Sequence, residues 1–291
     1  LYARMPSMAC VIFRPYMSLL TSRGCSYQCA YCHQTMGKTF RKRSAESVLS
    51  EMEVLRFKYG FKEFEFVDDC FNFDHQRMQD ILKGISHRIH DARLFFPHGL
   101  RADILEPDDM SLFKKAGTAS IAFAIETASP RLQKLIHKNL NINKSVLAIN
   151  ASVKAEIYSV GYFMIGFPTE SFEEACSTIE FAAHSTLHCA MFFLVTPFEG
   201  TKLAEMCSAL IEKRQGSIDP QNVTFYKNAV NISAISDREL QKVFRKAYMR
   251  FYLSPKRLIR LAIHHPSFLS LPLYAFLFFM KFLPRRNHCV K

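Results

Sequence analysis

Residues 25–32 read Cys25-Ser26-Tyr27-Gln28-Cys29-Ala30-Tyr31-Cys32 and hold three of the chain's nine cysteines. At this cysteine content, such a spacing arises by chance about 1% of the time. Three thiolates can hold three irons of a four-iron cubane and leave the fourth iron open to a small molecule. An electron carrier would close that position with a fourth cysteine, and Cys70 is the nearest in sequence. The loop therefore indicates an iron–sulfur centre with an open iron.

Strand-like and helix-like patterns alternate on both sides of the cysteine loop. Predicted strands cover Met17–Thr21, Phe61–Asp68, Arg93–Phe96, Ala119–Ile125, Tyr158–Ile165 and Ala190–Thr196. Helices are predicted from Ser44 to Gly60, Asp74–Ile89, Pro107–Gly117, from Pro130, from Lys144, Ser171–Ser185, Thr201–Arg214 and Asp237–Leu253. Such alternation is typical of parallel βαβ units. We expect an α/β fold, a partial (β/α)6 TIM-like barrel with a helical C-terminal extension.

Chemistry-bearing residues follow the ends of the predicted strands. The cysteine loop follows the first strand, Asp68 and Asp69 end the second, Glu126 follows the fourth and Gly166 follows the fifth. Functional residues of (β/α) barrels lie at the carboxyl ends of the strands. We therefore expect these side chains to share one edge of the barrel.

Three segments are predicted along the chain. Residues 1–14 are a lead-in, and because the chain begins with Leu we expect an upstream domain before it. The core covers 15–214, and 215–291 forms a linker and helical extension. Within the extension, Phe268–Leu283 is strongly apolar but shorter than the roughly 20 residues of a membrane span. It is interpreted as a helix packed on the barrel or, because basic residues flank it, as an interfacial membrane helix.

The composition describes a globular chain of 291 residues with 49% hydrophobic residues and a net charge of +12. The basic residues are dispersed, which favours solvated faces over nucleic-acid binding. No secretory signal is visible, and the cysteine spacing differs from that of a disulfide framework. We expect a cytoplasmic protein with peripheral contact to a membrane surface.

Several motifs together carry a family resemblance. They are Thr21–His33, Arg41–Glu46, Phe66–Asn72, Gly99–Asp103, Ile165–Glu170 and Thr196–Thr201, in which Glu199 replaces a proline. The chain resembles the radical S-adenosylmethionine (SAM) superfamily, and more narrowly the branch whose members often carry an N-terminal cobalamin (B12)-binding domain. The resemblance covers about residues 15 to 210.

The resemblance implies a cofactor pair and a set of contacts. A [4Fe–4S] cluster on Cys25, Cys29 and Cys32 would bind SAM and cleave it to a 5′-deoxyadenosyl radical. The implied SAM contacts are Tyr31 against adenine, Asp68 and Asp69 near the methionine amino group, Arg101 and Glu126 at polar parts, and Ile165 and Gly166 lining the adenine pocket.

Each implied contact also has a structural interpretation. Asp68 and Asp69 would cap the next helix or solvate a loop, and Glu126 would cap the helix at Ser129. Arg101 would pair with Asp103 or another carboxylate, Tyr31 would pack in the core, and Gly166 would form a turn before Pro168.

The cysteines themselves leave three other interpretations open. Cys29 to His33 matches the C-x-x-C-H haem-attachment pattern. The three cysteines with His33 would make a Cys₃His zinc site, although adjacent Cys32 and His33 are strained ligands for one tetrahedral ion. A non-enzymatic iron–sulfur electron carrier is the third.

The resemblance favours an enzyme that methylates an unactivated carbon or cyclises a lipid, tetrapyrrole or natural product. A methylthiotransferase acting on RNA or protein is the alternative, but its second cluster domain and RNA-binding β module are not visible. The expected partners are SAM, a small-molecule or lipid-like substrate and an electron donor such as a flavodoxin or ferredoxin. The cobalamin signature Asp-x-His-x-x-Gly is absent from the sequence, so any cobalamin would bind through a domain outside this chain.

Overall fold

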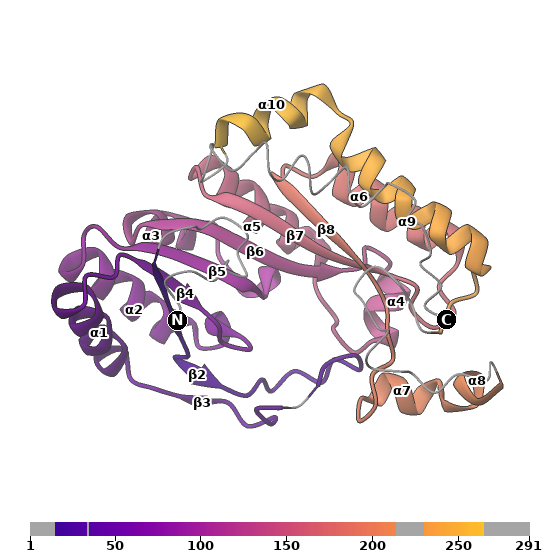
Figure 1. The fold of residues 1–291 in the computed structure, drawn as a ribbon, viewed down its shortest axis with the longest axis horizontal. Coiled ribbons are helices and arrows are strands. Elements are labelled where there is room, and N and C mark those ends of the chain that lie inside the picture. The colour runs from indigo at the N-terminus through magenta and orange to yellow at the C-terminus, as the bar shows by residue number, and fades with distance from the viewer. Residues whose placement is uncertain (1–14, 34, 214–229, 265–291) are drawn as a thin grey trace, which may run out of the picture.

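A computed structural model describes residues 15–33, 35–213 and 230–264. The predicted lead-in 1–14, most of the linker and the apolar stretch Phe268–Leu283 lie outside these residues. Six parallel strands form one sheet in the order β1-β4-β5-β6-β7-β8, and β1 and β8 are its two edges (Figure 1). The predicted partial (β/α)6 barrel is confirmed.

The strands follow the predicted positions closely. They are β1 (Tyr16–Leu19), β4 (Glu63–Phe66), β5 (Arg93–Leu100), β6 (Thr118–Glu126), β7 (Tyr158–Ile165) and β8 (Cys189–Leu194). A small antiparallel pair, β2 (Ser22–Arg23) with β3 (Arg41–Lys42), brackets the cysteine loop and was not predicted. This pair ties both ends of the loop together.

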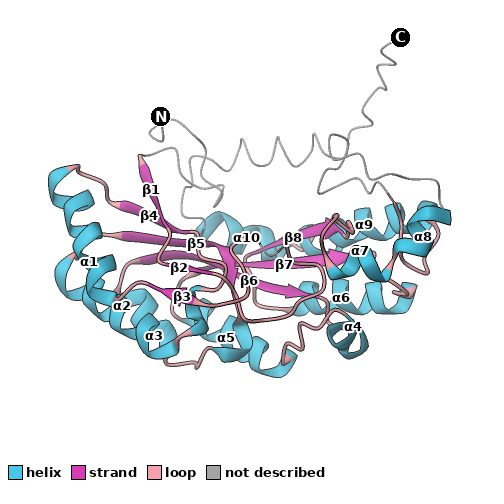
Figure 2. Cartoon of the chain, turned by 90° about the horizontal axis from the view of Figure 1, so that it is seen from below, coloured by secondary structure: helices cyan, strands magenta, loops and turns pink. Residues whose placement is uncertain are grey.

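Helices cover the outer face of the sheet, as Figure 2 shows for α1, α2, α3 and α5. The larger helices are α1 (Ala45–Glu53), extended by a π-helical turn η2 (Val54–Lys58), α2 (His75–Arg88), α3 (Asp109–Lys115), α5 (Ile142–Lys154), α6 (Phe172–His184), α9 (Asp237–Tyr252) and α10 (Pro255–His264). Short helices are η3 (Phe71–Phe73), η4 (Ala102–Ile104), α4 (Pro130–Leu135), α7 (Lys202–Met206) and α8 (Ser208–Lys213). The single helix predicted over Thr201–Arg214 is therefore wrong, because it is broken at Cys207.

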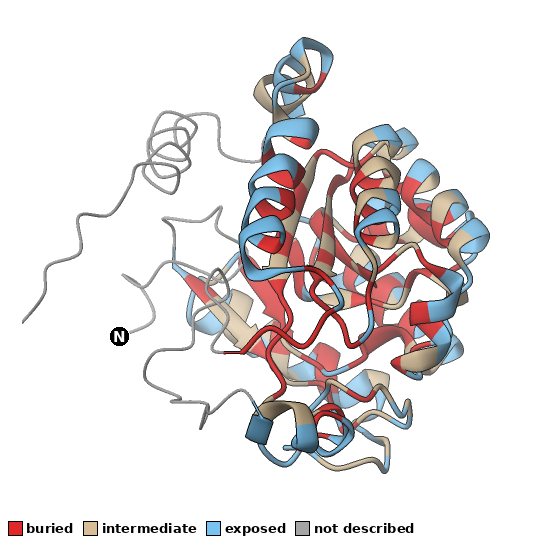
Figure 3. Ribbon diagram, turned by 90° about the vertical axis from the view of Figure 1, so that its right-hand side faces the viewer, coloured by how far each residue is buried: buried red, intermediate tan, exposed pale blue. Residues whose placement is uncertain are grey.

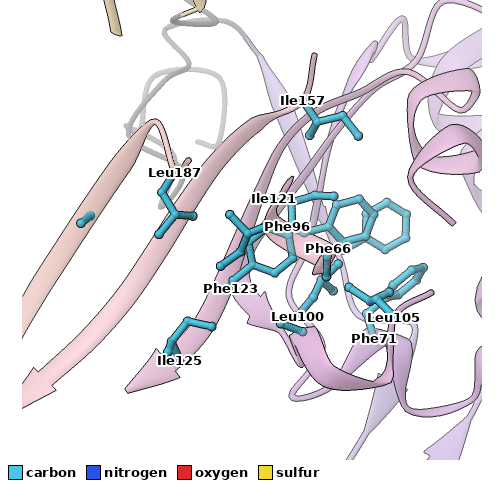
Figure 4. Close-up of a cluster of buried hydrophobic side chains, with 14 of the residues drawn as sticks. Phe66, Phe71, Phe96, Leu100, Leu105, Ile121, Phe123, Ile125, Ile157 and Leu187 are labelled. Carbon is cyan, nitrogen blue, oxygen red and sulfur yellow. The ribbon is translucent and has the colours of Figure 1, made fainter. Parts of the chain in front are cut away.

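The main core lies between the sheet and its helices. Aromatic rings fill its centre: Phe66 and Phe96 stack with centroids 4.8 Å apart, and Phe71 and Phe113 pack against Phe96 (Figure 4). All four rings are fully buried or nearly so. Burying four such rings contributes roughly 1.5–3 kcal/mol each, which fixes the strands to their covering helices.

The inner face of the sheet buries polar side chains, although an alternating strand usually turns its polar side chains to solvent. In β4, Phe64 and Phe66 face the helices, so Glu63 and Glu65 point the other way. Both carboxylates are nevertheless buried, at 3% and 1% exposed, and Glu63 pairs with Arg93 of the neighbouring strand at 2.8 Å. The polar half of the pattern therefore faces the barrel interior and not open solvent.

Candidate active site

The cysteine loop leaves β1 through a turn that only glycine fits. Gly24 has φ +79°, and a Cβ there would lie 2.4 Å from the carbonyl oxygen of Thr39. The next amide, that of Cys25, donates to the Gly37 carbonyl at 3.3 Å. These contacts bring Gly24 and Cys25 against residues 37–39, so that the three cysteines lie at the carboxyl edge of the sheet.

Asp68 and Asp69, which follow β4, hold this loop from the side. Asp68 Oδ1 accepts hydrogen bonds from the hydroxyls of Thr21 and Ser22, and Asp69 Oδ2 accepts from the amide of Gly24 at 3.0 Å. Neither residue caps the following helix, because Asp74 is the N-cap of α2. The capping interpretation is therefore wrong, and both carboxylates contact the segment that leads into Cys25.

Cys70 reaches the cysteine loop from the same segment. Its thiol is 4% exposed and is hydrogen-bonded to Cys25, a contact that is the main cause lowering the pKa of Cys25 to about 7. The side chain of Asn72 fixes the segment by bonding the backbone of Arg101 in both directions, at 2.8 and 3.2 Å. The cysteine nearest in sequence thus becomes a neighbour in space.

Cys29 and Cys32 form a second pair of thiols. The hydrogen bond between them is the main cause that lowers the pKa of Cys29 to about 6, and Lys138 lowers it further. The same bond raises the pKa of Cys32. The two thiols are therefore close neighbours, and binding a metal centre would require both to lose their protons.

This donor set fits a cubane better than a single ion. Within the described ranges, no three His, Cys, Asp or Glu side chains converge to hold one metal ion. The His33 ring contacts Phe198 instead, with centroids 5.5 Å apart. Both observations count against the Cys₃His zinc site. A [4Fe–4S] cluster takes each thiolate on a different iron, and three cysteines on one loop can supply them.

Glu126, at the end of β6, forms the second polar group of the site. Its Oε1 accepts from the Lys138 ammonium at 3.0 Å and from the Tyr31 hydroxyl at 3.1 Å, and Lys138 also reaches Tyr31 at 3.1 Å. Glu126 and Lys138 are each 7% exposed. Glu126 does not cap the next helix, whose N-cap is Ser129. A buried ion pair thus stands beside the cysteine loop.

The backbone around this ion pair is strained. Glu126, His137 and Asn139 all have positive φ, at 68°, 55° and 50°. The pairing register of β6 with β7 shifts between Ala124 and Glu126, and this shift marks a bulge at the end of β6. Left-handed non-glycine residues cost about 1–3 kcal/mol each and cluster at ligand sites. The strain aims Glu126 and Lys138 at each other and at Tyr31.

Ile165 and Gly166 lie at the end of β7, next to a buried carboxylate. Ile165 is fully buried in the core, and Gly166 has φ 103°. Both the Gly166 and Phe167 amides donate to Glu170 Oε2, the latter at 3.0 Å. Burial raises the pKa of Glu170 to about 7. This turn is therefore held from within by Glu170, and Gly166 marks its start.

Arg101 uses its guanidinium on neighbouring protein groups. It pairs with Asp103 at 2.9 Å, donates to the Asn139 carbonyl at 3.3 Å and lies 3.9 Å from the centroid of the Tyr27 ring. The pairing interpretation is confirmed. Arg101 therefore connects the β5 end to the cysteine loop and to the segment that carries Lys138.

Sequence reasoning missed Lys138, Glu170 and Asn72. Lys138 and Asn72 act through partners on other segments, whereas Glu170 bonds two amides of its own turn, and none of the three belongs to a periodic pattern. The one sequence signal near Lys138 is Asn139, a residue type that tolerates left-handed backbone. Tyr31, by contrast, was implied by the family resemblance. Its hydroxyl contacts Glu126 and Lys138, and its ring packs near Phe167 with 6.1 Å between centroids.

Residues 19–182, more than half of the chain, match the radical SAM superfamily. The chain belongs to that superfamily. Membership implies a [4Fe–4S] cluster and SAM as cofactors and makes the chain part of a radical SAM enzyme, which sets aside the haem-attachment interpretation.

Two relatives are methyltransferases by name. An uncharacterized methyltransferase of Pyrococcus horikoshii is 32% identical over 257 residues, covering 88% of this chain and 55% of the relative. The cytidylyl-2-hydroxyethylphosphonate methyltransferase of Streptomyces wedmorensis is 28% identical over 234 residues, covering 76% of this chain and 42% of the relative. The chain thus spans about half the length of the curated relatives it matches.

Two solved structures share the fold. The radical SAM methyltransferase TsrM of Kitasatospora setae, with cobalamin and a [4Fe–4S] cluster bound, superposes with a TM-score of 0.60 at 20% identity, over 66% of this chain and 39% of TsrM. The cobalamin-dependent radical SAM enzyme OxsB, with aqua-cobalamin and SAM bound, gives 0.62 at 15% identity, over 92% of this chain and 50% of OxsB. At these identities the likeness shows the fold alone.

Proposed function

We propose that this chain is the radical-generating core of a SAM-dependent methyltransferase that acts on an apolar substrate. The observation that carries the proposal is the loop after β1, in which Cys25, Cys29 and Cys32 lie at the carboxyl edge of an open parallel barrel. The names of the relatives favour methyl transfer over other radical reactions.

The three cysteines would hold the cluster, which supplies the electron that cleaves the sulfonium of SAM and starts radical chemistry. The protein's own share is positioning. Asp68 and Asp69 bond the segment entering Cys25, so we propose that they fix the loop and do not touch the methionine amino group.

SAM would lie along the ends of β6 and β7. Tyr31 and Gly166 would line its adenine, and Glu126 with Lys138 would face its polar parts. The side chain of Ile165 packs in the core on the helix side of β7 and is not part of this proposed contact. Lys138 would supply a cation to SAM, because it stands beside Cys29 as well as beside Glu126. A buried ion pair within reach of a zwitterionic ligand can exchange partners at low cost, because each charge keeps a counter-charge.

The inner face of β7 and β8 supports an apolar substrate. Phe163 of β7 faces the helices, and therefore Val160 and Met164, an odd number of residues away, face the barrel interior. Met191 and Phe193 do the same on β8. All four are only half-buried. Radical chemistry needs an interior without water, and an apolar wall supplies it.

Anaerobic reconstitution tests the proposal. The chain should bind about four irons and sulfides and, with dithionite and SAM, release 5′-deoxyadenosine or S-adenosylhomocysteine. The triple variant Cys25→Ala, Cys29→Ala, Cys32→Ala should lose the cluster. Cys176→Ala, a half-buried cysteine of α6, is the matched control. Cys70→Ala should keep the iron, since three thiolates suffice.

Two outcomes would contradict it. Retention of a cubane by the triple variant would show that Cys25, Cys29 and Cys32 are not the cluster ligands. A cluster that reduces with dithionite but never cleaves SAM would favour an electron carrier.

A further inference from the structure

Helix α10 is attached to the barrel by its charged side chains. Arg257 is 6% exposed and donates to the carbonyls of Leu187, Ala183 and Ser185, the last two at 2.7 and 3.0 Å. Its guanidinium also lies 3.8 Å from the centroid of the Phe251 ring. One turn later, Arg260 donates to the Thr186 carbonyl at 2.6 Å. The buried side of the helix is therefore its cationic side.

Three large apolar side chains of α10 lie away from this attached side. Leu258, Ile259 and Ile263 are 51%, 60% and 70% exposed. At 100° per residue, Ile259 and Ile263 lie on the side of the helix opposite Arg257. A helix that only packs on a globular protein buries its apolar stripe. This helix does the reverse, and Figure 3 shows it projecting at the top of the described fold.

The exposed apolar side chains continue onto the end of α9 and are bordered by cations. Met249 and Leu253 are 51% and 64% exposed. Lys242, Arg245 and Lys246, on the outer side of α9, line a shallow hollow with Met249, and exposed Lys256 lies at the start of α10. Large apolar side chains beside several Lys and Arg are the composition of an interfacial membrane surface.

We infer that the outer side of α10 and the end of α9 form a docking surface for an anionic phospholipid membrane. The membrane is the occupant that matches both features, since its acyl boundary receives Leu258, Ile259 and Ile263 while its headgroups neutralise the cations. A second copy of this chain presents the same positive charge. The segment after α10 is apolar over Phe268–Leu283 and basic at Lys281, Arg285 and Arg286, and it contains no acidic residue. Neither balances the charge of the surface.

The contact is peripheral by its dimensions. No helix within residues 15–33, 35–213 and 230–264 is long and apolar enough to cross a bilayer. A ten-residue helix such as α10 has a length of about 15 Å and lies along the headgroup boundary. The inference does not depend on the proposed methyl transfer, because it uses no residue of the cysteine loop.

Vesicle sedimentation of the full chain tests it. Wild type should bind vesicles of phosphatidylcholine with phosphatidylglycerol and bind pure phosphatidylcholine far less. The variant Ile259→Glu, Ile263→Glu should bind the anionic vesicles at least roughly tenfold more weakly. Lys242→Gln with Lys246→Gln should weaken binding by roughly fivefold for each cation removed.

The control is another exposed leucine. Leu147 on α5 is 56% exposed, so Leu147→Glu makes the same chemical change on a different face and should bind as wild type does. Unchanged thermal melting would confirm that all variants fold. Equal binding by wild type and the Ile259 and Ile263 variant would overturn the inference. So would a wild type that ignores anionic vesicles but forms a dimer that this variant dissolves, or one that binds RNA instead.

Discussion

Two strand ends present carboxylates to the same cysteine loop and bond them differently; Asp68 and Glu126 are buried, whereas Asp69 is exposed. After β4, Asp68 is bonded by hydroxyls and Asp69 by a backbone amide, all belonging to the loop segment itself. After β6, Glu126 is bonded by a lysine and a tyrosine and sits in left-handed backbone. The first arrangement uses neutral hydroxyl and amide donors. The second holds a buried charge pair on strained backbone.

The difference indicates different tasks. Donors that belong to the loop can only hold it in place, so the β4 end behaves as scaffolding. A strained, buried ion pair costs free energy that scaffolding does not require. We therefore assign loop positioning to Asp68 and Asp69 and ligand contact to Glu126 and Lys138. The predictions below separate these assignments, from the largest expected effect to the smallest.

Lys138→Ala should have the largest effect. It leaves Glu126 buried without its cation, and breaking a buried pair costs about 3–5 kcal/mol of unfolding free energy. Chemical denaturation of the cluster-free chain measures the loss. If the pair serves ligand binding, a chain refolded at low temperature should still take up iron but should bind SAM weakly.

The matched control replaces both charges. Glu126→Gln with Lys138→Met removes the pair together and should recover most of the lost stability without restoring SAM binding. Recovery of both would show that the ion pair is only structural.

Glu170 extends the comparison to a third strand end, where a buried carboxylate has amide donors only. Its pKa rises from 4.5 to about 7 because burial penalises the charged form. The folded state therefore favours the protonated acid. The stabilisation that protonated Glu170 gives the folded state is fully present below pH 4.5 and is lost as the pH rises through 7. The loss amounts to about 3 kcal/mol.

Glu170→Gln should flatten that part of the stability profile. Urea unfolding at pH 5 and pH 8 should show a smaller difference for the variant than for wild type. An unchanged difference would mean that other groups carry the pH dependence.

Asp68→Ala should cost about 2–3 kcal/mol, because two hydroxyls lose a charged acceptor. Its diagnostic effect is on the loop: iron bound per chain after reconstitution should fall, while Lys138→Ala should leave it unchanged. Equal iron content in both variants would contradict the assignment of different tasks to the two strand ends.

Tyr31→Phe should have the smallest effect on stability, about 1 kcal/mol, since one hydroxyl leaves a pair that remains intact. SAM affinity, measured by equilibrium binding to the reconstituted chain, should change little if the ring is what adenine meets. A large loss would assign the contact to the hydroxyl.

Local patterns predicted most of the fold and only part of the site. Tyr158–Ile165 was predicted with the bounds of β7, because strand alternation is a property of adjacent residues. The burial of Glu63 and Glu65 could not be predicted. The alternating pattern shows that they share one face of the strand, but it does not show what covers that face. The amphipathic pattern of α10 also does not show which side of the helix packs on the barrel. Arg257 attaches one side by donating to carbonyls about 70 residues away in the sequence.

By itself the sequence determined the cysteine loop, the order of strands and helices and the edge at which the site lies, since each depends on spacing along the chain. Tertiary structure alone decided that Cys70 meets Cys25 and that Lys138 pairs with Glu126. The reason is physical. A buried polar group must find a partner wherever the fold brings one, and sequence spacing does not record that distance.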